Sequence, residues 1–136
     1  MSTDIMIYRI KDFVRFNESG EVDFDRSMQV IRNLGMAASA FPGHNILADL
    51  RETSFVMDID MGVILKLASE MARLGSAFKG KMANVVPNEE KRLSIAKQFE
   101  ASMQLQGFNL KVFTSFEDAI DWFSEVTELR DPSQTT

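Results

Sequence analysis

The chain has 136 residues, 45% of them hydrophobic, and a formal net charge of −5 at pH 7. This composition is typical of a folded domain that buries its own core, and we expect a single domain over residues 1–129 followed by a flexible C-terminal tail over residues 130–136. The absence of cysteine excludes disulfides and thiolate chemistry, and the 15 Lys and Arg residues are too dispersed among 20 Asp and Glu residues to favour nucleic-acid binding.

Turn residues and hydrophobic periodicity predict nine elements along the chain. In chain order, with capping residues included, the predicted ranges are strand 5–10, strand 13–16, helix 23–40, strand 46–50, helix 58–74, strand 81–86, helix 88–107, strand 110–113 and helix 115–126. Lys11 and Asp12 join the first two strands in an antiparallel hairpin, and residues 17–20 are predicted as a turn. Strands separated by whole helices must return through a crossover and pair in parallel. We therefore predict an α/β fold of order ββαβαβαβα, with four helices and a mixed, mostly parallel sheet.

Residues with capping chemistry mark the helix ends. Asp23, Asn88 and Ser115 are suitable N-caps, because their side chains can accept hydrogen bonds from free backbone N–H groups. Gly75 and Gly107 are suitable at the C-terminal ends of the second and third helices, since glycine tolerates the backbone conformations found there.

The stretch from Asn45 to Leu65 places a strand end, a short connection and an apolar helix in succession. The segments that match a known signature here are Asp49-Leu50, Ser54-Phe55, Gly62 and Ile64-Leu65. In these segments the chain resembles the STAS domain, the fold of bacterial anti-sigma-factor antagonists known as SpoIIAA-like proteins. The C-terminal unit KVFTSFEDAIDWF strengthens the likeness to small STAS-related bacterial proteins of unknown function. The resemblance implies a STAS fold and a non-enzymatic regulatory or protein-interaction role.

The serine that is phosphorylated in such regulators aligns with Ile59, which has no hydroxyl group. Asp58 and Asp60 flank this position at the predicted helix start, where a carboxylate interacts favourably with the helix dipole by about 0.3–1 kcal/mol. Two interpretations follow. Either the two acids simply stabilise the helix start, or they give the loop permanently the negative charge that a phosphoserine would add on demand.

The same stretch also resembles a motif from a different class. An apolar strand followed by Asp58-Ile59-Asp60 is similar to the nucleophile motif of haloacid-dehalogenase-like, magnesium-dependent phosphohydrolases. That chemistry needs a lysine and further acids at later strand ends, and residues 87–90 and 114–115 do not supply them. The preceding strand is moreover predicted to end at Asp49. We therefore expect no enzyme, no cofactor and no metal site, with the phosphohydrolase as the lower-ranked alternative.

The predicted helix 58–74 has an apolar face wider than packing on one sheet requires. We interpret this face as core together with part of a dimer contact, and we expect the segment from Arg51 to Gly62 and this helix to form a contact surface. The candidate interaction or ligand residues are Asp49, Arg51, Ser54, Asp58, Ile59, Asp60, Met61, Gly62 and Met71. Asp49 and Arg51 have a second interpretation, as an ion pair that locks the loop.

These observations lead to expectations about partners and location. An unidentified protein partner, a second copy of the chain, or a small hydrophobic ligand fits the surface, and the alternative function is therefore a carrier of a small apolar ligand or lipid. No apolar run approaches the roughly 20 residues that span a bilayer, and the first residues lack the pattern of a signal peptide. We expect no transmembrane segment, no nucleic-acid partner and a cytoplasmic location.

Overall fold

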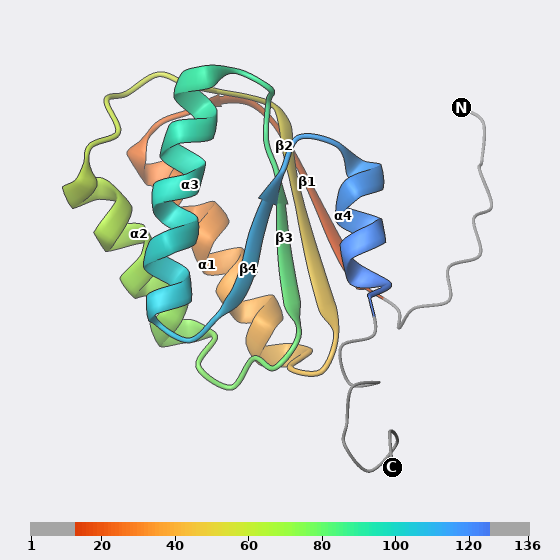
Figure 1. Cartoon of the computed structure of the whole chain (residues 1–136). Coiled ribbons are helices and arrows are strands. Elements are labelled where there is room, and N and C mark those ends of the chain that lie inside the picture. Colours follow the sequence, from red (N-terminus) through yellow and green to blue (C-terminus); the bar gives the residue numbers. More distant parts are fainter. Residues whose placement is uncertain (1–12, 126–136) are drawn as a thin grey trace, which may run out of the picture.

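The computed structural model describes residues 13–125, in which strands and helices alternate (Figure 1). The elements are β1 (Phe13–Val22), α1 (Phe24–Ala40), β2 (Asn45–Phe55), α2 (Met61–Leu74), β3 (Lys81–Val85), α3 (Glu90–Leu105), β4 (Asn109–Phe113) and α4 (Phe116–Phe123). The α/β class and the four helices are confirmed. The predicted strand over residues 5–10, its antiparallel hairpin and the predicted tail over residues 130–136 lie outside the described residues.

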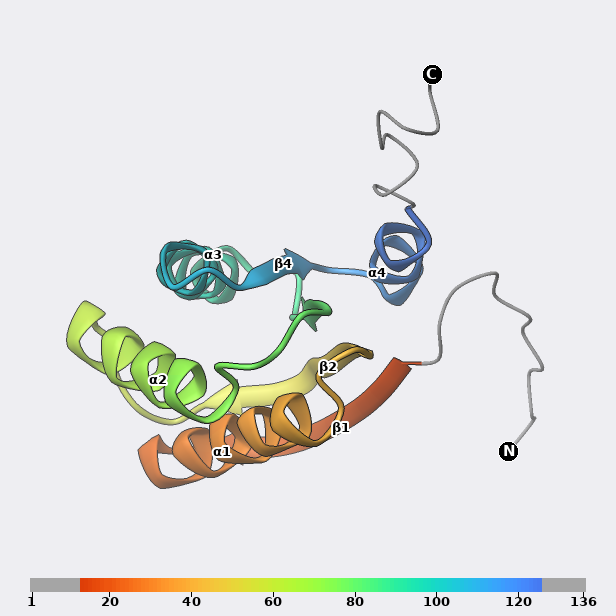
Figure 2. The same cartoon turned by 90° about the horizontal axis from the view of Figure 1, so that it is seen from below.

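The four described strands form one sheet in the order β1-β2-β3-β4, and every neighbouring pair is parallel. The helices α1, α2 and α3 cover one face of this sheet, whereas α4 lies on the opposite face (Figure 2). Each crossover between neighbouring strands thus uses the same face, and the chain passes to the other face only after β4.

Alternation of side chains along β2 and β3 builds a core on each face of the sheet. Ile46 and Met82 point toward α1, α2 and α3, whereas the next residues, Leu47 and Ala83, point toward α4. All four side chains are completely buried. Strands buried on both faces in this way read as nearly continuous apolar runs, which is what the sequence of β3 shows.

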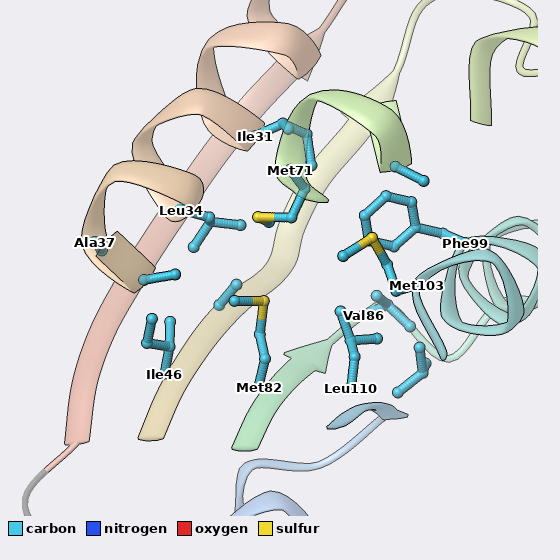
Figure 3. Packing of buried hydrophobic residues seen from close by; sticks show 14 of the residues in the cluster. Ile31, Leu34, Ala37, Ile46, Met71, Met82, Val86, Phe99, Met103 and Leu110 are labelled. Carbon is cyan, nitrogen blue, oxygen red and sulfur yellow. The ribbon is translucent and has the colours of Figure 1, made fainter. Parts of the chain in front are cut away.

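Packing explains most of the wide apolar face of α2, because α2 contacts both α1 and α3, while Met61 and Leu65 of this helix remain exposed. Met71 is completely buried and points into the cluster formed by Ile31, Leu34 and Met82 (Figure 3). In this structure Met71 is therefore a core residue, and it has no exposed surface to offer a partner.

The strands β1 and β2 are longer than the predicted strands 13–16 and 46–50. The turn predicted at residues 17–20 is wrong, because this segment continues β1 and pairs with β2 across a register shift between Asn17 and Ser19. Gly20 remains in the ladder with a φ of +93°, a conformation that glycine adopts at little cost. The predicted end of β2 at residue 50 is also wrong, since pairing continues to Phe55 opposite Val22. Ladder hydrogen bonds between the two strands outweigh the local turn preference of polar residues.

The caps are mostly as predicted. Asp23 and Ser115 are N-caps whose side chains accept hydrogen bonds from Arg26 N (2.8 Å) and Asp118 N (3.1 Å), and Gly75 is the C-cap of α2. The prediction for Asn88 is wrong, because the N-cap of α3 is the next residue, which makes no side-chain capping bond.

Candidate functional site

A cavity of about 110 Å³ lies between the sheet and the helices α1, α2 and α3. It is lined from the carboxyl-terminal parts of β1, β2 and β3 and from the amino-terminal parts of α2 and α3. In open α/β sheets, ligands bind outside the carboxyl ends of the strands. This cavity lies toward that end of the sheet, but beneath the helices, and the order of the described strands, β1-β2-β3-β4, has no reversal of the kind that opens a crevice outside the strand ends.

Most of the lining is hydrocarbon, because the inward faces of the three helices supply it. Representative lining residues are Val30, Ile31, Ile64, Leu67, Ala96 and Phe99. An apolar cavity of about 150 Å³ is known to hold benzene. This cavity is smaller, about 110 Å³, but it is open on one side, so it is suited to a compact group such as a branched aliphatic chain or a single ring of which part extends through the opening.

Two buried polar atoms in the lining have no hydrogen-bond partner among residues 13–125. They are Oγ of Ser27 on α1 and Oδ1 of Asn84 on β3, and the two residues are only 5% and 6% exposed. A buried polar atom without a partner costs about 1–3 kcal/mol. Such atoms are uncommon in folded proteins, and two at one cavity indicate that it receives water or a ligand with polar groups.

Arg92 adds a buried charge to the same lining, with 7% of its surface exposed. Its guanidinium donates hydrogen bonds to the Thr53 backbone oxygen (2.7 Å) and to Thr53 Oγ1 (2.8 Å), and lies 4.1 Å from the centre of the Phe55 ring. Burial lowers the pKa of Arg92 from its ordinary value, and the charge of Glu89 offsets part of this effect. The guanidinium stays protonated at neutral pH, because arginine does not lose its proton in proteins.

Asp49 and Arg51 belong to a separate cluster beside the start of α4. Arg51 Nη2 and Nε donate to the Asp49 carboxylate at 2.7 and 2.9 Å, and Arg15 Nη2 donates at 3.2 Å. The Arg15 guanidinium in turn lies 4.5 Å from the centre of the Phe116 ring. Arg51 holds the pKa of Asp49 below its ordinary value. Of the two interpretations of this pair, the ion pair is the one found; it lies within β2 and not beyond the strand end.

The two acids beside Ile59 have different roles in the structure. Asp60 is the N-cap of α2, and its Oδ1 accepts a hydrogen bond from Val63 N at 2.9 Å. Asp58 lies before the helix and is exposed, so the prediction that the helix begins there is wrong. Ile59 is half-buried and lines the cavity.

The other predicted contact residues of this region lie at the surface. Ser54 is exposed near the end of β2, and Met61 and Gly62 are exposed in the first turn of α2. Of the nine candidates, only Ile59 lines the cavity. Because β2 runs to Phe55, the Asp-x-Asp sequence does follow a strand, contrary to the prediction that the strand ends at Asp49. Within the described range, no group of three or more His, Asp or Glu side chains is placed to hold a metal ion.

Ser27, Asn84 and Arg92 were not predicted as site residues, although two of them carry a signal in the sequence. Arg92 stands four, seven and eleven positions before Ala96, Phe99 and Met103, and so lies on the apolar stripe of α3. Asn84 is a single amide inside the apolar strand MANVV. A polar residue at a core position is the pattern that would have identified both.

Comparison of the chain with protein-family models, with curated proteins and with solved structures finds no match. The STAS resemblance therefore stays a prediction. No helix between residues 13 and 125 has the length and apolar character needed to cross a membrane.

Proposed function

We propose that this chain is a small-molecule-binding module whose cavity, at the carboxyl ends of β2 and β3, holds a compact and mostly apolar ligand. The observation that carries the proposal is the pair of unpartnered atoms, Ser27 Oγ and Asn84 Oδ1, inside an apolar cavity. A ligand with an apolar body and a polar group would satisfy both features of this lining at once.

The size of the cavity limits how large a ligand of the predicted apolar-ligand or lipid carrier can be. Pockets for drug-sized ligands measure about 300–1,000 Å³, whereas this cavity measures about 110 Å³. A long acyl chain cannot be enclosed within it. The proposal is accordingly limited to ligands about the size of a single ring.

Water alone is a poor explanation of the cavity. A buried water needs two to four polar partners, which Ser27, Asn84 and Arg92 can supply at one part of the lining, but the rest of the lining is hydrocarbon. Water can occupy the space beside Ser27 and Asn84, but the apolar remainder of the cavity gains most from an apolar group.

A pair of variants on α3 tests this proposal. Ala96→Leu puts a larger side chain into the cavity, whereas Ala101→Leu makes the same change at an exposed position of the same helix. We expect ligand-observed NMR to detect binding of toluene or benzyl alcohol to the wild type and to Ala101→Leu, with at least a tenfold loss in Ala96→Leu. Binding that is unchanged in Ala96→Leu, or absent from the wild type, would contradict the proposal.

Native mass spectrometry of freshly purified protein provides an independent measurement. We expect a small adduct on the wild type that is missing from Ala96→Leu. Adducts of equal abundance on Ala96→Leu and Ala101→Leu would indicate attachment elsewhere on the molecule.

A second candidate is the regulatory or protein-interaction role, and exposed apolar groups on α2 support it. Met61 and Leu65 lie one turn apart and are 48% and 52% exposed. Apolar side chains that share a helix face and remain in water often mark a contact with another chain. In this proposal the partner is a second copy of the chain.

Size-exclusion chromatography with light scattering tests this second candidate. We expect a dimer for the wild type and for Ser94→Glu, an exposed position on α3, and a folded monomer for Leu65→Glu. A wild-type monomer would contradict it. Met71→Glu is not a suitable variant, because it places a charge in the core and unfolds the domain.

A further inference from the structure

Arg92 differs from the other arginines that the structure describes. Each of the other five forms an ion pair with a carboxylate, and all of them are partly exposed; they are Arg15, Arg26, Arg32, Arg51 and Arg73. Arg92 is the most buried of the six, and it has no ion pair within residues 13–125. Burying a charge is unfavourable unless an opposite charge or a full set of hydrogen bonds accompanies it.

The hydrogen bonds of Arg92 leave it incompletely satisfied. A guanidinium has five N–H donors, and Arg92 uses two of them on acceptors within the described chain, both belonging to Thr53. Thr53 is itself held, because its Oγ1 donates to the Leu50 backbone oxygen at 2.6 Å. Thr53 and the Phe55 ring thus fix the position of the guanidinium, while three donors remain for a further acceptor. An arginine held in this way is pre-organised for an anion.

The surrounding charges select a singly charged anion. Glu18 lines the same cavity, where it is paired with Arg26, and the charge of Glu89 acts on Arg92. A phosphate monoester carries close to two negative charges at neutral pH and would meet a single buried cation among these acids. A carboxylate carries one charge, and its two oxygens match the fork of a guanidinium.

We propose that the ligand of this cavity is a small monocarboxylic acid, with its carboxylate on Arg92 and its apolar body among the side chains of α1, α2 and α3. This inference rests on the proposed small-molecule-binding function and names its ligand class. Arg92 is then the residue that selects acids over neutral molecules of the same shape.

Three probes with one ring and different head groups test the inference on the unmodified protein. They are benzoate, benzyl alcohol and phenylphosphonate, with dissociation constants measured by calorimetry at pH 7. We expect benzoate to bind at least tenfold tighter than benzyl alcohol and tighter than phenylphosphonate. Equal affinities for benzoate and benzyl alcohol would overturn the inference while leaving the proposed function standing, and so would a preference for phenylphosphonate. Failure of all three probes to bind would contradict the proposed function itself.

Variants then assign the preference to one residue. We expect Arg92→Met to weaken benzoate binding to the level of benzyl alcohol, with benzyl alcohol itself changed by less than threefold. The matched control is Arg32→Met, an exposed arginine on α1 that pairs with Glu70 and does not line the cavity. An unchanged benzoate preference in folded Arg92→Met would overturn the inference.

Arg92→Lys keeps the positive charge but loses the forked pair of donors, and we expect its affinity for benzoate to lie between those of the wild type and Arg92→Met. If Arg92→Met does not fold, a benzoate affinity in Arg92→Lys equal to wild type overturns the inference.

Discussion

Two buried charged residues of this domain, Asp49 and Arg92, have different kinds of partner. Asp49 is surrounded by Arg51 and Arg15 from its own sheet, so its charge is neutralised by the chain. Arg92 is held by neutral oxygens and an aromatic ring. In the first arrangement, loss of the arginine partners leaves a buried charge unpaired, whereas in the second the charge is available to a ligand. Residue type and burial alone do not separate them, because both are charged residues with less than a tenth of their surface exposed.

The Asp49 cluster leads to an expected pH dependence. The folded pKa of Asp49 lies below its ordinary value of 3.8, mainly because of the hydrogen bond from Arg51. The ionised carboxylate therefore contributes stability above about pH 4, and this contribution is lost as the pH falls through the folded pKa. We expect Asp49→Asn to lower the free energy of unfolding by about 1–3 kcal/mol at pH 7, and the difference from wild type to shrink below pH 4 in urea titrations.

Glu70→Gln is the control for this pH dependence. Glu70 also accepts hydrogen bonds from two arginines, Arg73 and Arg32, and these bonds hold the pKa of Glu70 below its ordinary value, with the larger effect from Arg73. Those bonds are exposed to solvent, where ion pairs contribute little. We expect Glu70→Gln to lower the free energy of unfolding by less than Asp49→Asn does. A difference between wild type and Asp49→Asn that does not vary with pH would show that Asp49 acts through packing.

Replacing Asn84 is expected to change stability and ligand binding in opposite directions. Replacing a buried polar atom that has no partner by an apolar group of similar shape removes its desolvation cost. We therefore expect Asn84→Val to raise the free energy of unfolding of the ligand-free domain by about 1–3 kcal/mol and to weaken binding in the cavity. Asn45→Val is the control, since Asn45 Oδ1 accepts a hydrogen bond from Lys81 N at 2.9 Å, and its loss destabilises the domain. A less stable Asn84→Val would show that the amide is satisfied in the free protein.

At the scale of elements, local signals predicted what local interactions determine. Asp23 and Ser115 cap their helices as predicted, because a cap is formed within three residues of sequence. The lengths of β1 and β2 were not predictable, since residues 17–20 look like a turn until Val22 pairs with Phe55, 33 positions away. The edge of β4 that faces away from β3 also depends on another element, because Glu100 Oε2 on α3, 12 positions earlier, accepts a hydrogen bond from Val112 N at 2.8 Å.

The candidate site was harder to predict than the fold for the same reason. The sequence directed attention to the loop before α2, where the acids are conspicuous, and only Ile59 of that set lines the cavity. Ser27, Asn84 and Arg92 are separated by 57 and 8 positions and line one cavity only because α1 and α3 pack on the same face of the sheet as the Asn84 side chain. Arg92 and Asn84 each stand out as a polar residue at an apolar position, but nothing in the sequence joins them to Ser27 in one site until the helices are placed on the sheet.

The contact between α1 and α2 depends on a glycine. A Cβ atom added to Gly35 would lie 2.6 Å from Leu74 Cβ, which is closer than packed side chains approach. We expect Gly35→Ala to lower the free energy of unfolding by about 1–3 kcal/mol because of overpacking, although alanine favours a helix by about 1 kcal/mol. Gly43→Ala is the control, since nothing lies within 4 Å of the added atom. Equal thermal stability of the two variants would show that the helices separate at no cost.

At the scale of the whole molecule, the sheet couples two cores that share no helix. β2 and β3 contribute alternate residues to both, so the cluster around Met71 and the cluster around Trp122 cannot unfold separately without breaking the same strands. Among the described elements, only α4 covers the second face (Figure 2). The cavity belongs to the first face, and Trp122 does not line it.

This coupling is testable because Trp122, the single tryptophan of the chain, lies on α4 and is buried against Phe113 of β4. Its fluorescence reports on the α4 face, whereas far-UV circular dichroism is dominated by the longer helices α1, α2 and α3 on the other face. We expect the two probes to give coincident thermal transitions, as in a two-state domain. Benzoate at a hundredfold excess over its dissociation constant should then raise the free energy of unfolding by about 2.7 kcal/mol. Both thermal transitions should therefore move to higher temperature by the same amount. A fluorescence transition at a lower temperature than the circular dichroism transition, with a midpoint that benzoate does not change, would mean that α4 detaches alone. The reason is that a ligand stabilises only those parts of the fold that its binding requires.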